Sequence, residues 1–200
     1  NKAVYLTAGM HIVAMQLATP GMKEGELVGQ IQQVAISGEG QLSFPVILTK
    51  DGQTLHNHYH GNNLQEGDMI LCDAGAEISS GYAGDMTRTF PISSKFSETQ
   101  KELYQITLNA HNAAVDALKP GVPYLDIHFV ACLELAKGLT EVGLMKGNPH
   151  EAVAAGAHTM FFQCGLGHLL GMDVHDVGDY KVGGEWRVLE AGMCMTVEPG

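Results

Sequence analysis

The stretch LCDAGAEISSGYAGDMTRTF, Leu71–Phe90, decides how this chain folds, because it places two carboxylates beside two short strands. The run DMILCDAGAEI predicts one strand and GYAGDMTRTFPI a second, with Gly81 and Gly84 at bend or bulge positions. Asp73 directly follows the apolar residues MILC, and Asp85 follows GYAG. Burying an unpaired carboxylate costs on the order of several kcal/mol, so these acids need a positive partner.

Helices are predicted on both sides of these strands. Apolar residues recur at helical spacing through the first thirty-five residues, and TPGMKEGE (19–26) divides that region into two helices. The sequence predicts another helix from about Ser97 to Leu118, opened by SETQ, and a further one from KPGVPY to about Gly138. The run LSFPVILT predicts a strand, and glycine-punctuated strands and loops are expected from Met160 on. The fold class is therefore α+β.

Two pairs of segments resemble each other across the chain. ATPGMKEGEL (18–27) and LKPGVPYLDI (118–127) each place Pro-Gly between two helices. LQEGDMILCD (64–73) and LEAGMCMTVE (189–198) each begin with Leu, pass through Gly into an apolar strand, and reach a carboxylate nine residues after the Leu. The sequence therefore predicts a pseudo-two-fold domain whose halves each deliver an acid from a strand.

Charge and cysteine content limit the functional classes. The formal charge is −11, with 22 acidic and 11 basic residues, which disfavours a nucleic-acid surface. No apolar run approaches the length of a membrane span. Four cysteines form no CxxC pair, and Cys72 and Cys194 lie in apolar runs that predict core strands. Buried thiols in a reducing compartment, the cytoplasm, are the expectation.

Four residues in strand-like settings form a candidate metal-ligand set: Asp73, Asp85, His168 within GLGHLLG, and Glu198 after MCMTV. Arg88 is the obvious basic residue nearby, and it could pair with only one acid. Divalent ions would compensate all of them. A carboxylate-rich set with one imidazole suits manganese, cobalt or iron(II) and fits structural zinc poorly. It also suits a two-metal hydrolase.

LCDAGAEISSGYAGDMTRTF, GLGHLLGMDVHDVGDY and MTVEPG resemble the metal-dependent aminopeptidase P and prolidase family, whose catalytic domain has the pita-bread fold. That fold has pseudo-two-fold αβ halves, a curved, mostly antiparallel sheet and helices on its outer face. The resemblance implies that residues 1–200 belong to such a catalytic domain. It also implies that the family's N-terminal domain is absent and that the domain continues beyond Gly200.

The resemblance assigns metal ligands by position. Asp73, Asp85, His168 and Glu198 would hold two divalent ions, most often manganese, with cobalt, iron or zinc as alternatives, and Asp85 would bridge them. Thr87, two residues beyond Asp85, would support the ligands. A second bridging Glu of the family lies on a strand after the EPG turn, which places it after the last residue of this sequence.

Catalytic residues follow from the same resemblance. Glu198 would orient or deprotonate the nucleophilic water, and His175 in DVHD would stabilise the carbonyl oxygen. His56, seventeen residues before Asp73, matches a substrate-side histidine, and a gap of two would select His58 instead. Relatives commonly carry a histidine where this chain has Cys164, so substrate contacts or rate should differ there.

The triple histidine TLHNHYHGNN admits a rival interpretation. His56, His58 and His60, followed by Glu66, also fit a cupin-type metal site. A cupin barrel needs regularly spaced short strands, whereas this chain predicts helices of about twenty residues on both sides of its strands. The cupin interpretation also leaves the acids Asp73, Asp85 and Glu198 unexplained.

The expected function is a metallo-exopeptidase that hydrolyses the Xaa-Pro bond at the N-terminus of peptides through a hydroxide bridging two metals. Its expected partner is a peptide with proline at the second position, with no nucleic acid and no membrane, and the full-length protein is expected to be a homodimer. The alternatives are a prolidase restricted to Xaa-Pro dipeptides, a methionine aminopeptidase and a non-catalytic pita-bread binding module.

Overall fold

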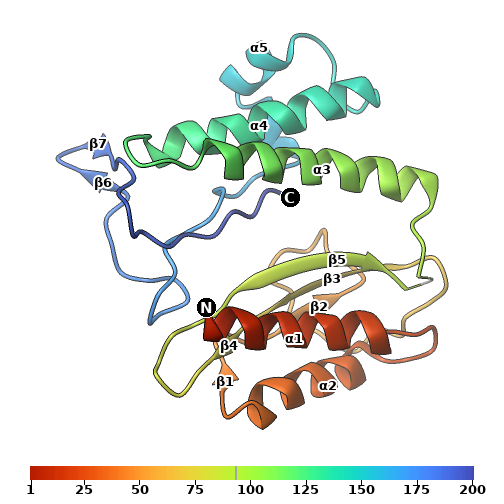
Figure 1. Cartoon of the computed structure of the whole chain (residues 1–200). Coiled ribbons are helices and arrows are strands. Elements are labelled where there is room, and N and C mark those ends of the chain that lie inside the picture. The colour runs from red at the N-terminus through yellow and green to blue at the C-terminus, as the bar shows by residue number, and fades with distance from the viewer. Residues whose placement is uncertain (93) are drawn as a thin grey trace. The chain divides into compact units, whose positions relative to one another are not determined.

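The computed structural model describes residues 1–92 and 94–200, and its chain divides into two compact units. Unit 1 comprises Asn1–Ser97 and Leu170–Asp176, and unit 2 comprises Glu98–Leu169 and Val177–Gly200. Each unit contains a pair of long helices joined through a Pro-Gly turn (Figure 1).

Unit 1 packs two helices against a small antiparallel sheet. Helices α1 (Lys2–Leu17) and α2 (Glu24–Ser37) are followed by β1 (Gln41–Leu42), β2 (Ile47–Thr49), β3 (Met69–Ala74), β4 (Ala76–Glu77) and β5 (Met86–Pro91). Strand β3 lies between β2 and β5, and β1 pairs with β4. The strand expected at 42–49 is thus two short strands, interrupted near Pro45, which lacks the N–H that a ladder needs.

The core of unit 1 follows the alternation along β3. Ile70, Cys72 and Ala74 are buried, whereas Met69, Leu71 and Asp73 are only partly buried. The buried face packs with Met10 of α1 and Leu27 of α2 in one apolar cluster. This period of two leaves Asp73 on the less buried face of the strand.

Unit 2 is dominated by helices. It contains α3 (Glu98–Ala117), α4 (Tyr124–Glu141), α5 (Pro149–Ala154), the 3-10 helix η1 (Ala157–Met160), β6 (Lys181–Val182) and β7 (Glu185–Trp186). Small residues allow α3 and α4 to approach closely, since a Cβ on Gly138 would lie 2.6 Å from Ile106 Cγ2. Their buried faces form one cluster with Phe162, Leu166 and Leu189.

Hydrogen bonds within each unit confirm the internal repeat. In unit 1, the Gly21 N–H donates to the Leu64 carbonyl at 2.8 Å and the Leu64 N–H to Met22 at 2.9 Å. In unit 2, the Gly121 N–H donates to the Leu189 carbonyl at 2.8 Å and the Leu189 N–H to Val122 at 2.9 Å. Both glycines have a φ of 90°, a conformation that L side chains rarely adopt. The two copies therefore share one turn geometry as well as a sequence pattern.

The burial of Cys72 and Cys194 depends on which face of its extended segment each residue occupies. Cys72 is fully buried, and burial raises the pKa of its thiol to about 12, so it packs as a small apolar group. The expectation of a buried Cys194 is wrong, because that residue is exposed. Met193, Met195 and Val197 turn toward the unit 2 core, and the alternation of an extended segment turns Cys194 the other way.

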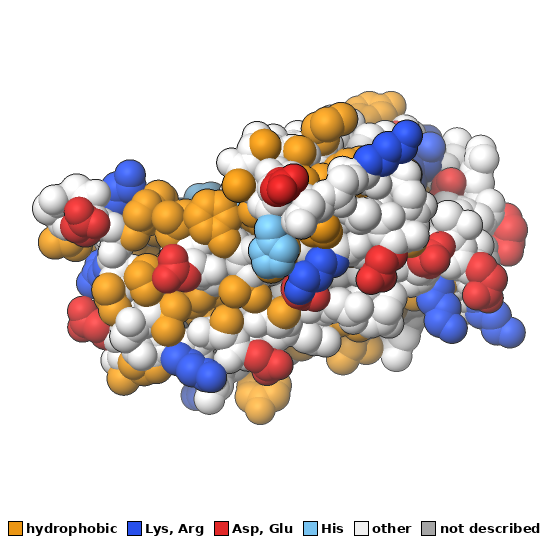
Figure 2. All heavy atoms as spheres, turned by 90° about the horizontal axis from the view of Figure 1, so that it is seen from above, with side chains coloured by type: hydrophobic (Ala, Val, Ile, Leu, Met, Phe, Trp, Pro, Cys, Tyr) orange, Lys and Arg blue, Asp and Glu red, His pale blue; other side chains and the backbone are white. Residues whose placement is uncertain are grey.

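Charged side chains do not gather by sign on the face in Figure 2, where acidic and basic groups lie among hydrophobic ones.

In the part of the chain that the structure describes, no helix is long and apolar enough to cross a bilayer.

Candidate functional site

Unit 1 places two of the predicted ligands at one end of its central strand pair. Asp73 of β3 lies opposite Thr87 of β5 in the antiparallel register. Asp85 comes one residue before β5 and two before Thr87, so the extended alternation favours the same face for it. The ladder thus brings the Asp73 and Asp85 positions, twelve residues apart in sequence, to neighbouring positions.

Glycines allow the backbone to close around these two carboxylates. A Cβ on Gly75 would collide with the carbonyl oxygen of Gly84, and one on Gly84 would collide with Thr7 Oγ1. The Gly84 N–H donates to Ala76 O at 2.9 Å, and Thr7 Oγ1 accepts from the Ala76 N–H at 2.9 Å. Gly75, two residues after Asp73, and Gly84, the residue before Asp85, are therefore held against each other, and no side chain fits between them.

A buried histidine outside the sequence-predicted set binds the backbone next to Asp73. His11 of α1 is 2% exposed, and its Nε2 donates to the Ala74 carbonyl at 3.1 Å. Burial lowers the pKa of His11, which favours the neutral ring. Thr7 and His11 are polar residues one turn apart on the buried face of α1, and that spacing is the signal that would have revealed them.

Unit 2 brings the other two predicted ligands together. The Glu198 N–H donates to Leu166 O at 2.7 Å, and the Thr196 N–H donates to His168 O at 2.9 Å. This antiparallel pairing sets His168 Nε2 3.2 Å from Glu198 Oε1, with the two side chains 15% and 33% exposed. Residues thirty positions apart in the sequence thereby form one imidazole–carboxylate pair.

The hydrogen bonds of His168 fix what its ring can bind. Its Nδ1 lies 2.9 Å from the Leu169 carbonyl, which can only accept, so Nδ1 carries the proton. In the neutral ring, Nε2 then presents a lone pair toward the Glu198 carboxylate. Two acceptors facing each other require a cation between or beside them, either a proton or a metal ion. An Nδ1–H donated to a carbonyl with Nε2 directed at the ion is the usual arrangement of a metal-binding histidine. These residues therefore fit a divalent ion.

Two further residues position this pair, and neither was predicted from the sequence. Thr196 is buried, and its Oγ1 accepts from the His168 N–H at 2.9 Å. The Tyr124 hydroxyl, at the start of α4, donates to the Thr196 carbonyl at 3.1 Å. Burial raises the pKa of Tyr124 well above its usual value, with Glu198 adding to the effect, so the hydroxyl keeps its proton for this bond.

A glycine lets the two segments of unit 2 meet, and it yields a stability prediction. A Cβ on Gly167 would lie 2.6 Å from Thr196 Oγ1 and closer still to the Thr196 carbonyl oxygen. We expect Gly167→Ala to lower the free energy of unfolding by about 1–3 kcal/mol, because a backbone atom cannot move aside cheaply. Gly165→Ala is the matched control, since no atom lies within 4 Å of its added Cβ. Chemical denaturation measures both variants, and equal losses would contradict the proposed contact.

The histidines of TLHNHYHGNN lie on a loop of unit 1 and not on a strand. His56 is exposed in a turn with a φ of 52°. His58 Nδ1 and His60 Nε2 both approach the Val46 carbonyl, at 3.5 and 3.1 Å. His175 is exposed on the segment 170–176. The loop geometry separates His56 from the other two, whose rings share one backbone acceptor.

A buried carboxylate anchors both ends of that loop. Glu24 of α2 is fully buried and accepts from the Lys50 N–H at 2.8 Å and from Asn62 Nδ2 at 3.1 Å. A carboxylate that accepts several N–H bonds satisfies its charge inside a protein. The histidine loop is therefore tied to α2 at both ends.

A helix pair joined by a Pro-Gly turn occurs twice, and each pair is followed by an antiparallel segment that carries an acid. This arrangement defines a duplicated α+β fold. The chain belongs to metallopeptidase family M24, whose model matches residues 1–200.

The individual relatives are Xaa-Pro aminopeptidases. The chain is 39% identical to the Xaa-Pro aminopeptidase of Escherichia coli strain K12 over 203 residues, which cover 100% of this chain and 46% of that protein. It is 41% identical to Xaa-Pro aminopeptidase 2 of Streptomyces coelicolor over 150 residues, which cover 72% of this chain and 31% of that protein. The chain thus spans about half or less of the length of these relatives.

Solved structures confirm the expected fold. Pseudomonas aeruginosa aminopeptidase PepP matches with a TM-score of 0.96 and 40% identity, covering 99% of this chain and 45% of that one. Escherichia coli aminopeptidase P with the inhibitor Pro-Leu matches with a TM-score of 0.94 and 38% identity, covering 98% and 45%.

Proposed function

We propose that this chain is the catalytic part of a metal-dependent aminopeptidase that hydrolyses the Xaa-Pro bond at the N-terminus of peptides. The proposal rests on the family assignment and on the identity to Xaa-Pro aminopeptidases. The observation that carries it is the approach of His168 Nε2 to Glu198 Oε1 at 3.2 Å, with the Nδ1 proton given to a backbone carbonyl. Fold alone would not support an activity, whereas a ligand pair with a fixed tautomer does.

In this proposal Asp73, Asp85, His168 and Glu198 would hold the divalent metal, and Thr87 would support them from beside Asp73. Manganese suits a set of three carboxylates and one imidazole, and cobalt, iron(II) or zinc are the alternatives. Divalent ions bound there would supply Lewis acidity and a nucleophile at neutral pH. Asp73 and Thr87 are register partners in β3 and β5, which supports their assignment to one set.

The remaining residues act on the substrate and on protons. Glu198 takes the proton of the attacking water. His175 and His56 donate hydrogen bonds to the oxygen of the scissile carbonyl as it gains negative charge. His58 is the alternative to His56. The full-length protein would be a cytoplasmic homodimer acting on peptides with proline at the second position.

Substrate length tests the proposal and separates it from its nearest competitor. With Mn²⁺ present, the protein is expected to cleave Ala-Pro-Ala and the dipeptide Ala-Pro, with the higher kcat/KM on the longer peptide. Ala-Ala-Ala should be a poor substrate, and dialysis against a chelator should abolish cleavage until metal is restored. Cleavage of the dipeptide alone would establish the prolidase. A protein that binds divalent metal and cleaves none of these peptides would point to a binding module.

A further inference from the structure

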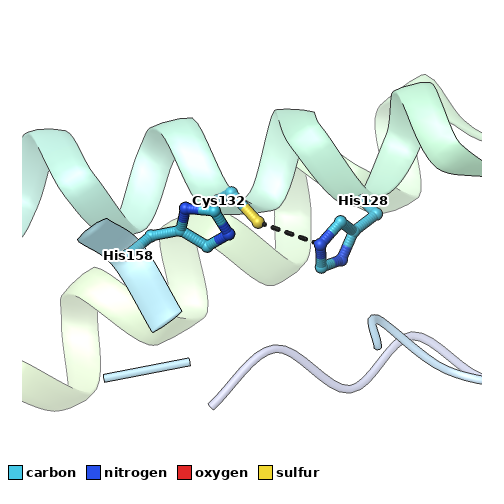
Figure 3. Close-up of side chains that lie close together, drawn as sticks. All are labelled: His128, Cys132 and His158. Carbon is cyan, nitrogen blue, oxygen red and sulfur yellow. Dashed lines mark hydrogen bonds between the residues drawn. The ribbon is translucent and has the colours of Figure 1, made fainter. Parts of the chain in front are cut away.

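A second group of metal-binding side chains lies in unit 2, on elements other than those that carry His168 and Glu198. His128 and Cys132 are one turn apart on α4, and His158 belongs to η1, so all three converge on one point (Figure 3). One ligand atom from each lies within 4.8 Å of the others. Cys132 Sγ is 3.3 Å from His128 Nε2. Spacing of four residues on a helix places two ligands on one face.

Burial makes this cluster costly without a bound ion. Cys132 is fully buried and His158 is 6% exposed. The Nδ1 atoms of His128 and His158 are both buried without a hydrogen-bond partner among the described residues. A buried polar atom without a partner costs roughly 1–3 kcal/mol. The thiol contact already uses His128 Nε2, so the unpaired atom that an ion beside Cys132 could take up is Nδ1 of His158.

The protonation states of His128 and Cys132 favour metal binding and disfavour an imidazolium–thiolate ion pair. Burial lowers the pKa of His128, and the neighbouring His158 lowers it further, so a neutral ring with an available lone pair is favoured. Burial raises the pKa of the Cys132 thiol to about 11, so the thiolate does not form by itself near neutral pH. A divalent cation would stabilise the thiolate, and the thiol proton would pass to solvent on binding.

A cavity beside the cluster gives an ion access and room for a fourth ligand. Its volume is about 390 Å³, and its lining includes His128, His158, Tyr124, Phe162 and Cys164. A site with three protein ligands and an adjoining cavity leaves one coordination position for water or a small ligand.

We propose that His128, Cys132 and His158 bind one zinc ion, in a site separate from the carboxylate-rich centre of the proposed peptidase. Zinc bonds of about 2.3 Å to sulfur and about 2.0–2.1 Å to nitrogen, in tetrahedral geometry, separate S and N by about 3.5 Å. The observed 3.3 Å between Sγ and Nε2 fits this value. The soft thiolate selects zinc or cobalt(II) over manganese, which prefers oxygen ligands. The ion would join α4 to η1, the element that precedes the segment leading to His168.

Cobalt(II) is the probe that separates the two sites, because only a thiolate ligand gives an intense sulfur-to-cobalt charge-transfer band in the near ultraviolet. Titrating the metal-free, reduced protein with Co²⁺ is expected to produce this band, with a final intensity that corresponds to one thiolate-bound ion per chain. Excess Zn²⁺ should then bleach it. Cys132→Ala should abolish the band, and His158→Ala should weaken Co²⁺ binding at this site by at least about tenfold.

Two matched variants serve as controls. Cys194→Ala removes an exposed thiol and should leave the band unchanged, and so should His168→Ala, which alters the carboxylate-rich set instead. Circular dichroism before metal addition tests whether Cys132→Ala is folded. Co²⁺ binding without the band would overturn the proposal. So would a band that survives Cys132→Ala and disappears in Cys164→Ala, because the exposed thiol would then be the ligand.

Discussion

His168→Ala is expected to abolish metal-dependent hydrolysis of an Xaa-Pro peptide while the chain remains folded. The imidazole supplies the nitrogen ligand of the proposed set, and its Nδ1 bond to Leu169 O directs Nε2 toward Glu198. Loss of a group that merely orients a metal ligand costs roughly 10–100-fold in affinity or activity. Removing the ligand itself should cost more, so we expect kcat/KM with Mn²⁺ to fall by more than about 100-fold.

Three measurements make this prediction specific. Metal content after dialysis should fall in His168→Ala, because a ligand is missing. Asp85→Asn in unit 1 should have the same consequence, since it removes a proposed carboxylate ligand. His150→Ala, an exposed histidine on α5, is the matched control and should retain full activity and metal content. Full activity in His168→Ala with unchanged metal content would remove His168 from the proposed centre.

Glu198→Gln is expected to have an effect of similar size through a different step. The amide has nearly the shape of the carboxylate but lacks its charge and its ability to take a proton. Loss of a general base typically costs about 10²–10⁴ in rate, so kcat should fall by about that factor. KM should change far less, because the substitution leaves the proposed substrate contacts at His56 and His175 in place.

The apo protein offers an independent readout of the same substitution. Glu198 Oε1 lies 3.2 Å from His168 Nε2, and a contact between these two acceptors stabilises the ring only when Nε2 is protonated. Glutamine can donate an N–H to a neutral Nε2, so metal-free Glu198→Gln should be at least as stable as the parent near neutral pH. Thermal unfolding of both metal-free proteins measures this. Glu190→Gln, an exposed position in the same segment, controls for the amide itself. A large loss of stability in Glu198→Gln would mean that the carboxylate has a structural role.

Much of the fold follows from the sequence alone. Helical periodicity and the Pro-Gly turns predicted α1, α2, α3 and α4 close to their observed bounds, because long amphipathic segments are determined locally. The repeated Leu-to-carboxylate segments predicted two similar halves, and the paired bonds of Leu64 and Leu189 confirm them. Helix α5 and strands β6 and β7 were not predicted individually, since such short elements depend on their neighbours more than on their own periodicity.

The choice of ligand candidates also came from the sequence, because an acid after an apolar run is conspicuous. The contacts around those acids could not be predicted from the sequence. His11 donating behind Asp73 and Tyr124 holding Thr196 are contacts across 63 and 72 residues, and no local pattern encodes such distances. The burial of Cys194 was mispredicted for the same reason, since an apolar run does not determine which alternate residues face the core.

The sequence by itself determined the helix pairs, their duplication and the residue types offered to a metal, since periodicity, turn chemistry and charge are properties of short segments. Only the tertiary structure decided the approach of His168 to Glu198, the glycine contacts at Gly84 and Gly167, and the meeting of Cys132 with His158. Each of these depends on an atom from a distant segment arriving within hydrogen-bonding or van der Waals distance. Such an approach is fixed by how the elements pack, and packing is a property of the whole chain.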